Sequence, residues 1–295
     1  MAEPIGIITI KDALSEATQR LHEAGIESAR LDGEVLLAYI LKVKREYLYA
    51  HPERLLGFNE YEEYQAVLER RATRLPVSYI TGSKEFMSLD YIVNEHVLIP
   101  RPETEILVEE TVSRLEVLRR VHDPLIVVDI GTGSGAIAVA IAWFLEAVDV
   151  IGTDISCDAL AVAKKNAEKH KVDDRIRFLQ GDLLSPLNGK GLEHRITAIV
   201  SNPPYLSGRA MAEVPPEVAK EPKAALVGGE QGLNFLFVIL EDAPRFLAPG
   251  GFVALEIGYD QAKTLTGFAK DVPGYTKVTT VPDLAGIERV LIANI

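Results

Sequence analysis

The chain has 295 residues, of which 47% are apolar and 25% are charged, and its net charge is −12. This length leaves room for one large domain, or for a large and a small one, and the composition is typical of a globular protein with a sizeable core. The acidic balance argues against a surface that grips long nucleic acid through its phosphates. A single cysteine excludes an intramolecular disulfide, and no basic segment precedes an apolar run at the start, so we expect a cytoplasmic protein without a secretory signal.

The first part of the chain has the spacing of amphipathic helices. Apolar residues recur at helical intervals after Thr9, Ser28 and Asn59, and the first of these patterns stops at Gly25. We therefore expect a small helical domain over residues 1–75. It is too short to house a cofactor site and contains no cofactor motif, so we interpret it as a substrate-docking domain.

The spacing then changes to that of short strands, at 77–80, 85–87 and 89–93. We expect these strands to form a β-hairpin hinge over residues 76–98. The hinge would join the helical domain to a catalytic domain over residues 99–295.

A helix is predicted from Pro102 to about Leu118, just after the hinge. Proline in the first turn and the acids Glu103 and Glu105 behind it match the preferences of helix N-termini. Arg101 does not, because a cation is unfavourable at the positive end of the helix dipole. We therefore expect Arg101 to have a functional role, in binding substrate.

A buried strand at 125–130 leads into a turn that favours close approach to a ligand. The turn consists of Gly131, Thr132, Gly133, Ser134 and Gly135. Its glycines adopt backbone angles that other residues avoid. The spacing also fits G-x-G-x-x-A, ending at Ala136, so a dinucleotide site is an alternative. A second strand at 148–153 ends at Asp154, which would accept both ribose hydroxyl hydrogens in either kind of site.

Two further acids favour S-adenosylmethionine over NAD. Asp129 lies just before the glycine turn, two residues ahead of Gly131, where it would face the α-ammonium group of the cofactor and would repel a pyrophosphate. A third strand at 175–180 is followed by Asp182, which would accept the exocyclic amine of an adenine, and by Leu183. The glycine turn and these acids together predict a pocket for S-adenosylmethionine.

The fourth strand, 196–201, ends in Asn202, Pro203, Pro204 and Tyr205. Prolines cannot donate to a sheet ladder, so the strand stops and a stiff loop follows at its carboxyl end. The side-chain oxygen of Asn202 and the carbonyl of Pro203 are two acceptors that would orient a substrate NH₂ group beside the cofactor. Tyr205 would pack on the flat substrate group. The alternative is an ordinary proline-rich turn.

The remaining pattern completes a seven-stranded Rossmann-like α/β sheet, with the last strand antiparallel. The expected elements are helices at 233–247 and 261–270 and strands at 251–257, 275–281 and 288–293. Glu256 lies in an apolar strand, and a buried carboxylate needs a partner, either within the site or in loop backbone.

The histidines are scattered without ligand spacing, so we expect no metal. We also expect the Cys157 thiol to be packed.

With these residues in hand, the chain resembles the class I methyltransferases and, more narrowly, the release-factor glutamine methyltransferases. The likeness extends over the whole chain, and its most specific part is the arginine-proline-glutamate segment. It is carried by 99–105, 129–135, 202–205, Glu221-Pro222 and Ala225-Leu226. At Leu183, some relatives carry a large aromatic against the adenine.

The resemblance implies a protein-(glutamine-N5) methyltransferase that acts in translation termination. Its substrate would be the glutamine of the Gly-Gly-Gln motif in peptide-chain release factors, and S-adenosyl-L-methionine would be the methyl donor. Asn202, Pro203 and Tyr205 are the expected catalytic residues. Asn202 also belongs to the cofactor-binding set, and Pro204 and Arg101 to the substrate-binding set.

Three alternatives remain. The first is a nucleic-acid methyltransferase that modifies the amino group of adenine or cytosine. DNA adenine-N6 methyltransferases share the Asn-Pro-Pro-Tyr motif, but the acidic composition counts against stable nucleic-acid binding. A sister family that modifies a ribosomal-protein glutamine shares the architecture. A protein that binds the cofactor and only docks a partner would need a damaged pocket, yet the glycines, Asp154 and Asn202 are present. No apolar run approaches the length of a membrane span, so no membrane partner is expected.

Overall fold

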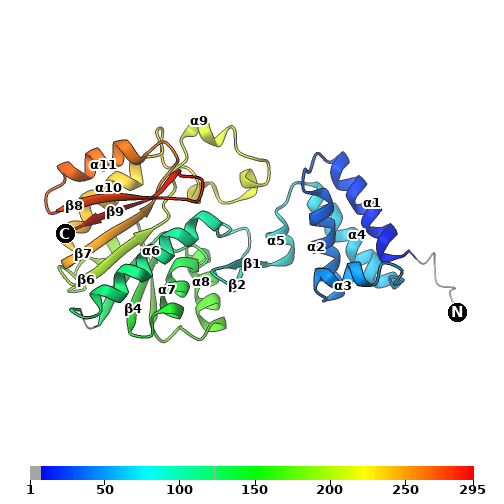
Figure 1. Cartoon of the computed structure of the whole chain (residues 1–295), viewed down its shortest axis with the longest axis horizontal. Helices are drawn as coiled ribbons and strands as arrows, with labels where there is room; N and C mark the ends of the chain where they lie inside the picture. The colour runs from blue at the N-terminus through cyan, green and yellow to red at the C-terminus, as the bar shows by residue number, and fades with distance from the viewer. Residues whose placement is uncertain (1–7, 123) are drawn as a thin grey trace. The chain divides into compact units, whose positions relative to one another are not determined.

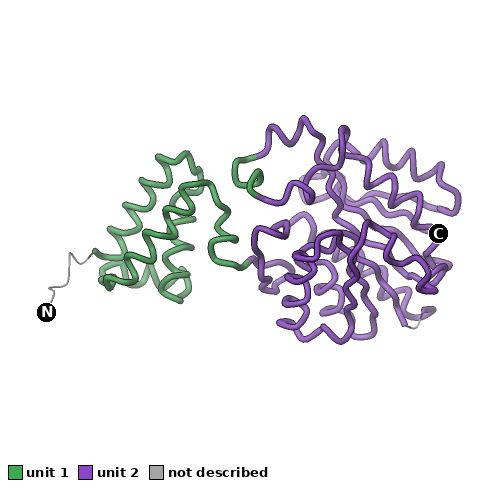
Figure 2. The backbone as a smooth tube through the Cα atoms, turned by 180° about the vertical axis from the view of Figure 1, so that it is seen from behind, with its two compact units in different colours: residues 1–83, 215–220 green, residues 84–214, 221–295 purple. Residues whose placement is uncertain are grey.

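The computed structural model describes residues 8–122 and 124–295. The chain folds into two compact units, which Figure 2 distinguishes by colour. One comprises the described residues up to Ser83 together with Pro215–Lys220, and the other comprises Lys84–Val214 and Glu221–Ile295. Residues 76–83 of the expected hinge are therefore part of the first unit. In the described residues, no helix is long and apolar enough to cross a membrane.

The first unit is helical. Its helices are α1 (Ile10–Glu23), α2 (Ala29–Leu41), α3 (Arg45–Ala50), α4 (Phe58–Ala72) and α5 (Val77–Thr81). Helix α1 begins where the side chain of Thr9 accepts the backbone N–H of Asp12. In the core of the unit, the fully buried Tyr64 donates its hydroxyl to the carbonyl of Gly33 at 3.0 Å. A side chain at Gly33 would crowd that hydroxyl, so glycine allows the two helices to approach.

The strand expected at 77–80 is wrong, because these residues form helix α5. A short apolar run does not distinguish a strand from a buried helical turn. Gly82, with φ of 73°, ends the helix. The hairpin follows as β1 (Ser83–Phe86) and β2 (Leu89–Ile92), and its turn residues Met87 and Ser88 both have positive φ, as a tight hairpin turn requires.

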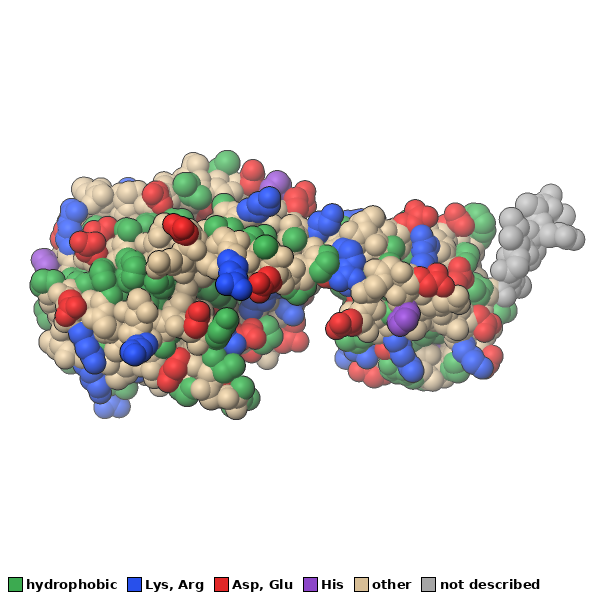
Figure 3. Space-filling model, turned by 90° about the horizontal axis from the view of Figure 1, so that it is seen from above, with side chains coloured by type: hydrophobic (Ala, Val, Ile, Leu, Met, Phe, Trp, Pro, Cys, Tyr) green, Lys and Arg blue, Asp and Glu red, His purple; other side chains and the backbone are tan. Residues whose placement is uncertain are grey.

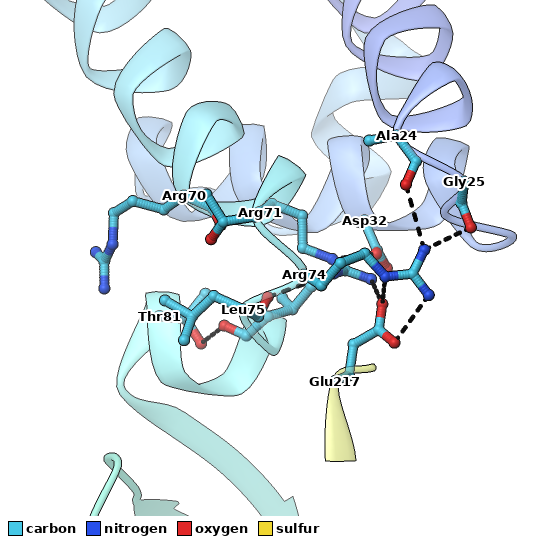
Figure 4. A network of polar contacts seen from close by, with 11 residues as sticks. Ala24, Gly25, Asp32, Arg70, Arg71, Arg74, Leu75, Thr81 and Glu217 are labelled. Carbon is cyan, nitrogen blue, oxygen red and sulfur yellow. Dashed lines mark hydrogen bonds and ion pairs between the residues drawn. The ribbon is translucent and has the colours of Figure 1, made fainter. Parts of the chain in front are cut away.

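The short segment Pro215–Lys220 belongs to the helical unit although it lies far along the chain (Figure 4). Glu217 pairs with Arg71 at 2.8 Å and with Arg74 at 3.0 Å. The Arg71 side chain is only 4% exposed, and its Nε also donates to Asp32 at 2.8 Å. Two arginines of the helical unit thus hold a segment 146 positions away in the sequence from Arg71.

The second unit is built on a seven-stranded sheet in the order β5-β4-β3-β6-β7-β9-β8. The strands are β3 (Leu125–Ile130), β4 (Val148–Asp154), β5 (Ile176–Gln180), β6 (Ile196–Ser201), β7 (Leu247–Glu256), β8 (Lys277–Pro282) and β9 (Glu288–Asn294). Strand β9 runs antiparallel to both β7 and β8, and the pairs β5-β4, β4-β3, β3-β6 and β6-β7 are parallel. The α/β sheet expected from the sequence, with an antiparallel last strand, is confirmed.

Helices cover both faces of this sheet (Figure 1). One face packs against α6 (Pro102–Leu118), α7 (Ala136–Phe144) and α8 (Cys157–Lys169). The other packs against α10 (Asn234–Asp242) and α11 (Ala262–Asp271), and α9 (Gly208–Met211) lies in the long loop after β6. Alternate residues of β3 enter the two cores, Val127 one and Val128 the other, which explains the continuous apolar run of a buried parallel strand.

Two local expectations need correction. The helix expected to reach Leu247 ends at Asp242, because Pro244 follows and a short 3₁₀ turn leads directly into β7. Cys157, expected to be packed, is exposed.

Candidate active site

The glycine turn after β3 has the backbone that its sequence predicts. Gly131, Gly133 and Gly135 have φ of 67°, 55° and 79°. These are left-handed values that residues with a side chain rarely adopt. At Gly135 the space is also restricted, because an added Cβ would lie 3.1 Å from the Cβ of Ala163. Glycine therefore both shapes this turn and lets α7 pack closely on α8.

Asp129 is fully buried near the end of β3, two residues before Gly131. Its Oδ2 accepts the hydroxyl of Thr132 at 2.6 Å and the backbone N–H of Ala138 at 3.1 Å, while Oδ1 has no hydrogen-bond partner among the described residues. Burial raises the pKa of this carboxyl to about 7, although the two hydrogen bonds act in the opposite direction. An unpartnered carboxylate oxygen at this place fits a group that is to receive a cationic ammonium.

Asp154, the last residue of β4, is hydrogen-bonded to backbone. Its Oδ2 accepts the N–H of Gly133 at 2.9 Å, and its Oδ1 accepts the N–H of Ser156 at 2.9 Å. A carboxylate oxygen has a second lone pair, so both oxygens keep capacity for further donors. Asp154 thus restrains the glycine turn and remains able to accept hydroxyl hydrogens.

Asn166, in α8, is a residue that sequence reasoning missed. It is fully buried, and its amide accepts the N–H of Ile92 at 2.7 Å and donates to the carbonyls of Ile92 and Ser134. One amide therefore ties the hairpin strand β2 to the glycine turn. The available signal was an asparagine among apolar residues that recur at helical spacing in α8, such as Val162, Ala163 and Ala167.

A side-chain hydrogen bond holds the start of the loop after β6 against the end of β3. The buried Ser201 donates its hydroxyl to the carbonyl of Ile130, at 2.7 Å, and so joins the ends of β6 and β3. Pro203 is buried, and Asn202, Pro204 and Tyr205 are half-buried. The Asn202 side chain donates from Nδ2 to Thr104 Oγ1 at 3.0 Å.

Glu256 finds its partners within this site. It is 1% exposed at the end of β7, and it accepts the hydroxyl of Thr104 at 2.6 Å and the phenol of Tyr205 at 3.0 Å. Burial, and then the charge of Glu256, raise the pKa of Tyr205, so the phenol keeps its proton and remains a donor. Of the two partners considered for Glu256, site residues or loop backbone, the structure has the site residues. The role of Thr104 was missed, although it lies in the segment that carries the family resemblance.

Arg101 has a partner that the sequence did not reveal. Its guanidinium pairs with Glu221, which is buried and also accepts the backbone N–H of Ile99 at 3.0 Å. A buried carboxylate thus offsets the cation at the start of α6. This pairing accounts for the presence of Arg101, and its contact with substrate stays a prediction.

The remaining expected site residues lie at the same edge of the sheet. Because β5, β4, β3, β6 and β7 are neighbours and run parallel, the residues at their carboxyl ends gather at one edge. Asp182 follows β5 and is exposed, and Leu183 is half-buried, with its carbonyl accepting the hydroxyl of Thr153 at 3.1 Å. Among the described residues, no cluster of His, Cys, Asp or Glu could hold a metal ion.

Comparison with known proteins identifies the family of this chain. Residues 12–82 match the family described as PrmC N-terminal domain, and residues 112–231 match the family described as Methyltransferase small domain. The release factor glutamine methyltransferase of Moorella thermoacetica is 41% identical over 97% of this chain and 98% of its own length. The chain belongs to the release factor glutamine methyltransferase family. The Geobacter sulfurreducens member is 40% identical over 99% of this chain and 98% of its own length.

A bifunctional methyltransferase of Rickettsia felis is also similar, at 36% identity over 96% of this chain and 58% of its own length. Solved structures confirm the methyltransferase fold. A methyltransferase from Pyrococcus furiosus aligns with a TM-score of 0.50 and 21% identity, covering 77% of this chain and 98% of that one. Membership of a class I methyltransferase family implies that S-adenosylmethionine is the methyl donor.

Proposed function

We propose that this protein transfers a methyl group from S-adenosylmethionine to the side-chain amide nitrogen of the glutamine in the Gly-Gly-Gln motif of peptide-chain release factors. The observation that carries the proposal is the Asn202 side chain. Its NH₂ group is used by Thr104 at 3.0 Å, so its oxygen is the atom left to accept a substrate N–H. The family relationship supports the choice of substrate.

The residues at the edge of the sheet fit the proposed cofactor. Asp129, with one unpartnered carboxylate oxygen, would receive the ammonium group, and Asp154 would accept the ribose hydroxyls. Asp182 and Leu183 would contact the adenine. When bound, the cofactor supplies an electrophilic methyl group on a sulfonium.

The protein's task is to orient the substrate amide, because the lone pair of an amide nitrogen is delocalised into its carbonyl. The Asn202 oxygen and the Pro203 carbonyl would each accept a hydrogen bond from one of the two N–H groups of the substrate amide. These two bonds would direct the nitrogen lone pair toward the methyl group. Positioning of this kind supplies up to roughly 7–11 kcal/mol of a barrier. Tyr205 would pack on the amide plane, and its electron-rich ring favours a nearby cation by about 0.5–2 kcal/mol. The amide nitrogen becomes cationic as it takes the methyl group, and it then loses one proton to water, so no strong base is needed.

The charge distribution supports a protein substrate over a long nucleic acid. The net charge is −12, and on the face of the larger unit in Figure 3, Lys and Arg side chains are separated by acidic and apolar ones. Nucleic-acid binding would favour a continuous basic surface. The helical unit, without cofactor residues of its own, would dock the release factor. A substrate from the translation machinery agrees with the expected cytoplasmic location.

Methyl transfer from labelled cofactor tests the proposal. The protein is incubated with a release factor, with the same factor whose motif glutamine is replaced by alanine, with ribosomal proteins, and with DNA and RNA. We expect label in the first factor only, and loss of that label with the Asn202→Ala enzyme. Label in a ribosomal protein or in nucleic acid, with none in the release factor, would contradict the proposal.

A further inference from the structure

A chain of hydrogen bonds connects the buried carboxylate of Glu256 to the amide of Asn202 through one hydroxyl. Thr104 Oγ1 lies 2.6 Å from Glu256 Oε2 and 3.0 Å from Asn202 Nδ2. Thr104 is 4% exposed and Glu256 is 1% exposed, so water competes little for these bonds. The second carboxylate oxygen accepts the phenol of Tyr205 at 3.0 Å.

The chemistry of these groups determines the direction of each bond. An ionised carboxylate only accepts, and a hydroxyl has one hydrogen. The hydrogen of Thr104 therefore goes to Glu256, and the Thr104 oxygen is left as an acceptor. Asn202 must present its NH₂ group to Thr104, which turns the amide oxygen away. The two flipped orientations of an asparagine amide have nearly the same shape, so the hydrogen bonds alone decide between them.

We propose that Glu256 and Thr104 are positioning residues that fix the rotation of the Asn202 amide so that its oxygen, and not its NH₂ group, faces the substrate amide. This inference rests on the proposed function and deepens it. The same carboxylate fixes the phenol of Tyr205, so one buried charge orients two residues of the Asn-Pro-Pro-Tyr loop. A wrongly flipped Asn202 would place N–H against N–H and lose the acceptor.

Protonation of Glu256 would reverse the direction of the bonds. A neutral Glu256 donates to Thr104, whose hydrogen is then free for the Asn202 oxygen, and the amide flips. Burial raises the pKa of Glu256 to about 7, so this change falls in the neutral range. The hydrogen bonds from Thr104 and Tyr205 lower the pKa of Glu256. The negative charge of Glu103 on α6 raises this pKa, and the positive charge of Arg289 on β9 lowers it.

Substitutions at Thr104 separate positioning from a structural role. Thr104→Val keeps the shape and removes the relay, and Thr104→Ser keeps the hydroxyl. Thr111→Val is the matched control, because Thr111 is fully buried in the same helix and, within the described part of the chain, its hydroxyl bonds only the carbonyl of Leu107 one turn earlier. Glu256→Gln is the second test, because an amide accepts at one end and donates at the other, so it can no longer accept from both Thr104 and Tyr205 and the bond directions are no longer fixed.

The measurement is the single-turnover rate of methyl transfer to a release factor at saturating cofactor. We expect Thr104→Val and Glu256→Gln to slow transfer by about 10–100-fold, with the affinity for cofactor and the KM for the factor nearly unchanged. Thr104→Ser should restore most of the rate, and Thr111→Val should transfer at the wild-type rate. A Thr104→Val rate equal to that of Thr111→Val would overturn the inference.

The pH profile is the readout that a structural role alone would not move. Since the relay needs ionised Glu256, the wild-type rate should fall as the pH is lowered through about 7. Saturating cofactor suppresses the titration of Asp129, and Thr104→Val should lack this fall. An unchanged fall in Thr104→Val would contradict the inference. A wild-type enzyme that transfers no methyl group to any release factor would overturn the proposed function and this inference with it.

Discussion

The backbone N–H of Gly133 donates to Oδ2 of Asp154 at 2.9 Å. The acid at the end of β4 therefore holds the glycine turn that follows β3, and its other oxygen holds the N–H of Ser156, at the N-cap of α8, at 2.9 Å. Asp154 is consequently a structural residue of the turn as well as the proposed ribose ligand.

Asp154→Ala should weaken cofactor binding by more than the loss of the ribose contacts alone. Leaving the ribose hydroxyls and the N–H groups of Gly133 and Ser156 without their acceptor costs about 1–3 kcal/mol of binding free energy. This corresponds to a roughly 5–150-fold rise in the Kd for cofactor. Asp154→Asn keeps one acceptor oxygen and should have a smaller effect. Calorimetric titration with cofactor measures both variants. Unchanged affinity in Asp154→Ala would remove this residue from the pocket.

Cofactor affinity should depend on pH through Asp129. Burial raises the pKa of its carboxyl to about 7, and a cationic ligand binds the ionised form. The affinity should therefore rise by up to about tenfold per pH unit as the pH approaches 7, and level off above it. Binding should release protons, which titration in two buffers of different ionisation enthalpy detects. Asp129→Asn should give a flat profile, and a flat profile in the wild type would refute the assignment.

In the protein without cofactor, the raised pKa of Asp129 makes the free energy of unfolding fall as the pH rises, whereas the affinity for cofactor rises with pH. Because the folded pKa of Asp129 lies above its usual 3.8, the contribution of this carboxyl to the free energy of unfolding is fully present below that pH. It is lost as the pH rises through about 7. Denaturant unfolding of wild type and Asp129→Asn across this range gives the difference.

Replacing Asn202 should slow the methyl-transfer step far more than it weakens cofactor binding. Asn202→Asp keeps one acceptor oxygen and adds a negative charge near the sulfonium. That attraction fades as the sulfur loses its charge in the transition state. A carboxylate also cannot donate to Thr104, so the substrate amide would be held in a different rotation. We expect kcat to fall about 10²-fold in Asn202→Asp and at least as far in Asn202→Ala. Near-normal single-turnover rates in both would mean that the substrate amide is held elsewhere.

The parts of the fold that depend on local pattern were predictable. The apolar β-branched runs of β3, β4 and β6 gave strands close to the observed bounds, and the glycines after β3 required left-handed backbone. Side chains at the ends of neighbouring parallel strands gathered as expected. The prediction of a strand at 77–80 was wrong because the apolar run there is too short to distinguish the period of a helix from that of a strand.

The parts that depend on distant partners were not predictable from one sequence. The pairing of Arg101 with Glu221 and of Arg71 with Glu217 joins residues far apart in the chain. Glu256 could be recognised as needing a partner, because it lies in an apolar strand. Its partner Thr104 lies on a helix 152 positions earlier, where nothing in the local pattern marks a threonine as a relay.

Glu217→Ala should destabilise the helical unit and release the segment Pro215–Lys220. It leaves Arg71, whose side chain is 4% exposed, with Asp32 as its remaining acidic partner. We expect a loss of about 1–3 kcal/mol in the free energy of unfolding of this unit and faster proteolysis within the segment. Glu213→Ala is the control, because its pair with Arg209 is exposed on both sides. Equal behaviour of the two variants would show that the ion pairs do not hold the segment.

The docking role of the helical unit is tested best in the full chain. Deleting residues 1–75 would also remove Arg71 and Arg74, the partners of Glu217. Serine substitutions at exposed apolar residues of the unit avoid this, at Leu31, Tyr39 and Phe58. We expect the triple variant to raise the KM for an intact release factor several-fold and to leave the rate with a short Gly-Gly-Gln peptide unchanged. Equal effects on both substrates, or none on either, would argue against docking.

Tandem mass spectrometry of a release factor, after incubation with enzyme and cofactor, locates the transferred methyl group. We expect one added methyl group on the side-chain nitrogen of the Gly-Gly-Gln glutamine, and none when Asn202→Ala replaces the wild-type enzyme. A methyl group on another residue of the factor, or undiminished modification by the Asn202→Ala enzyme, would contradict it.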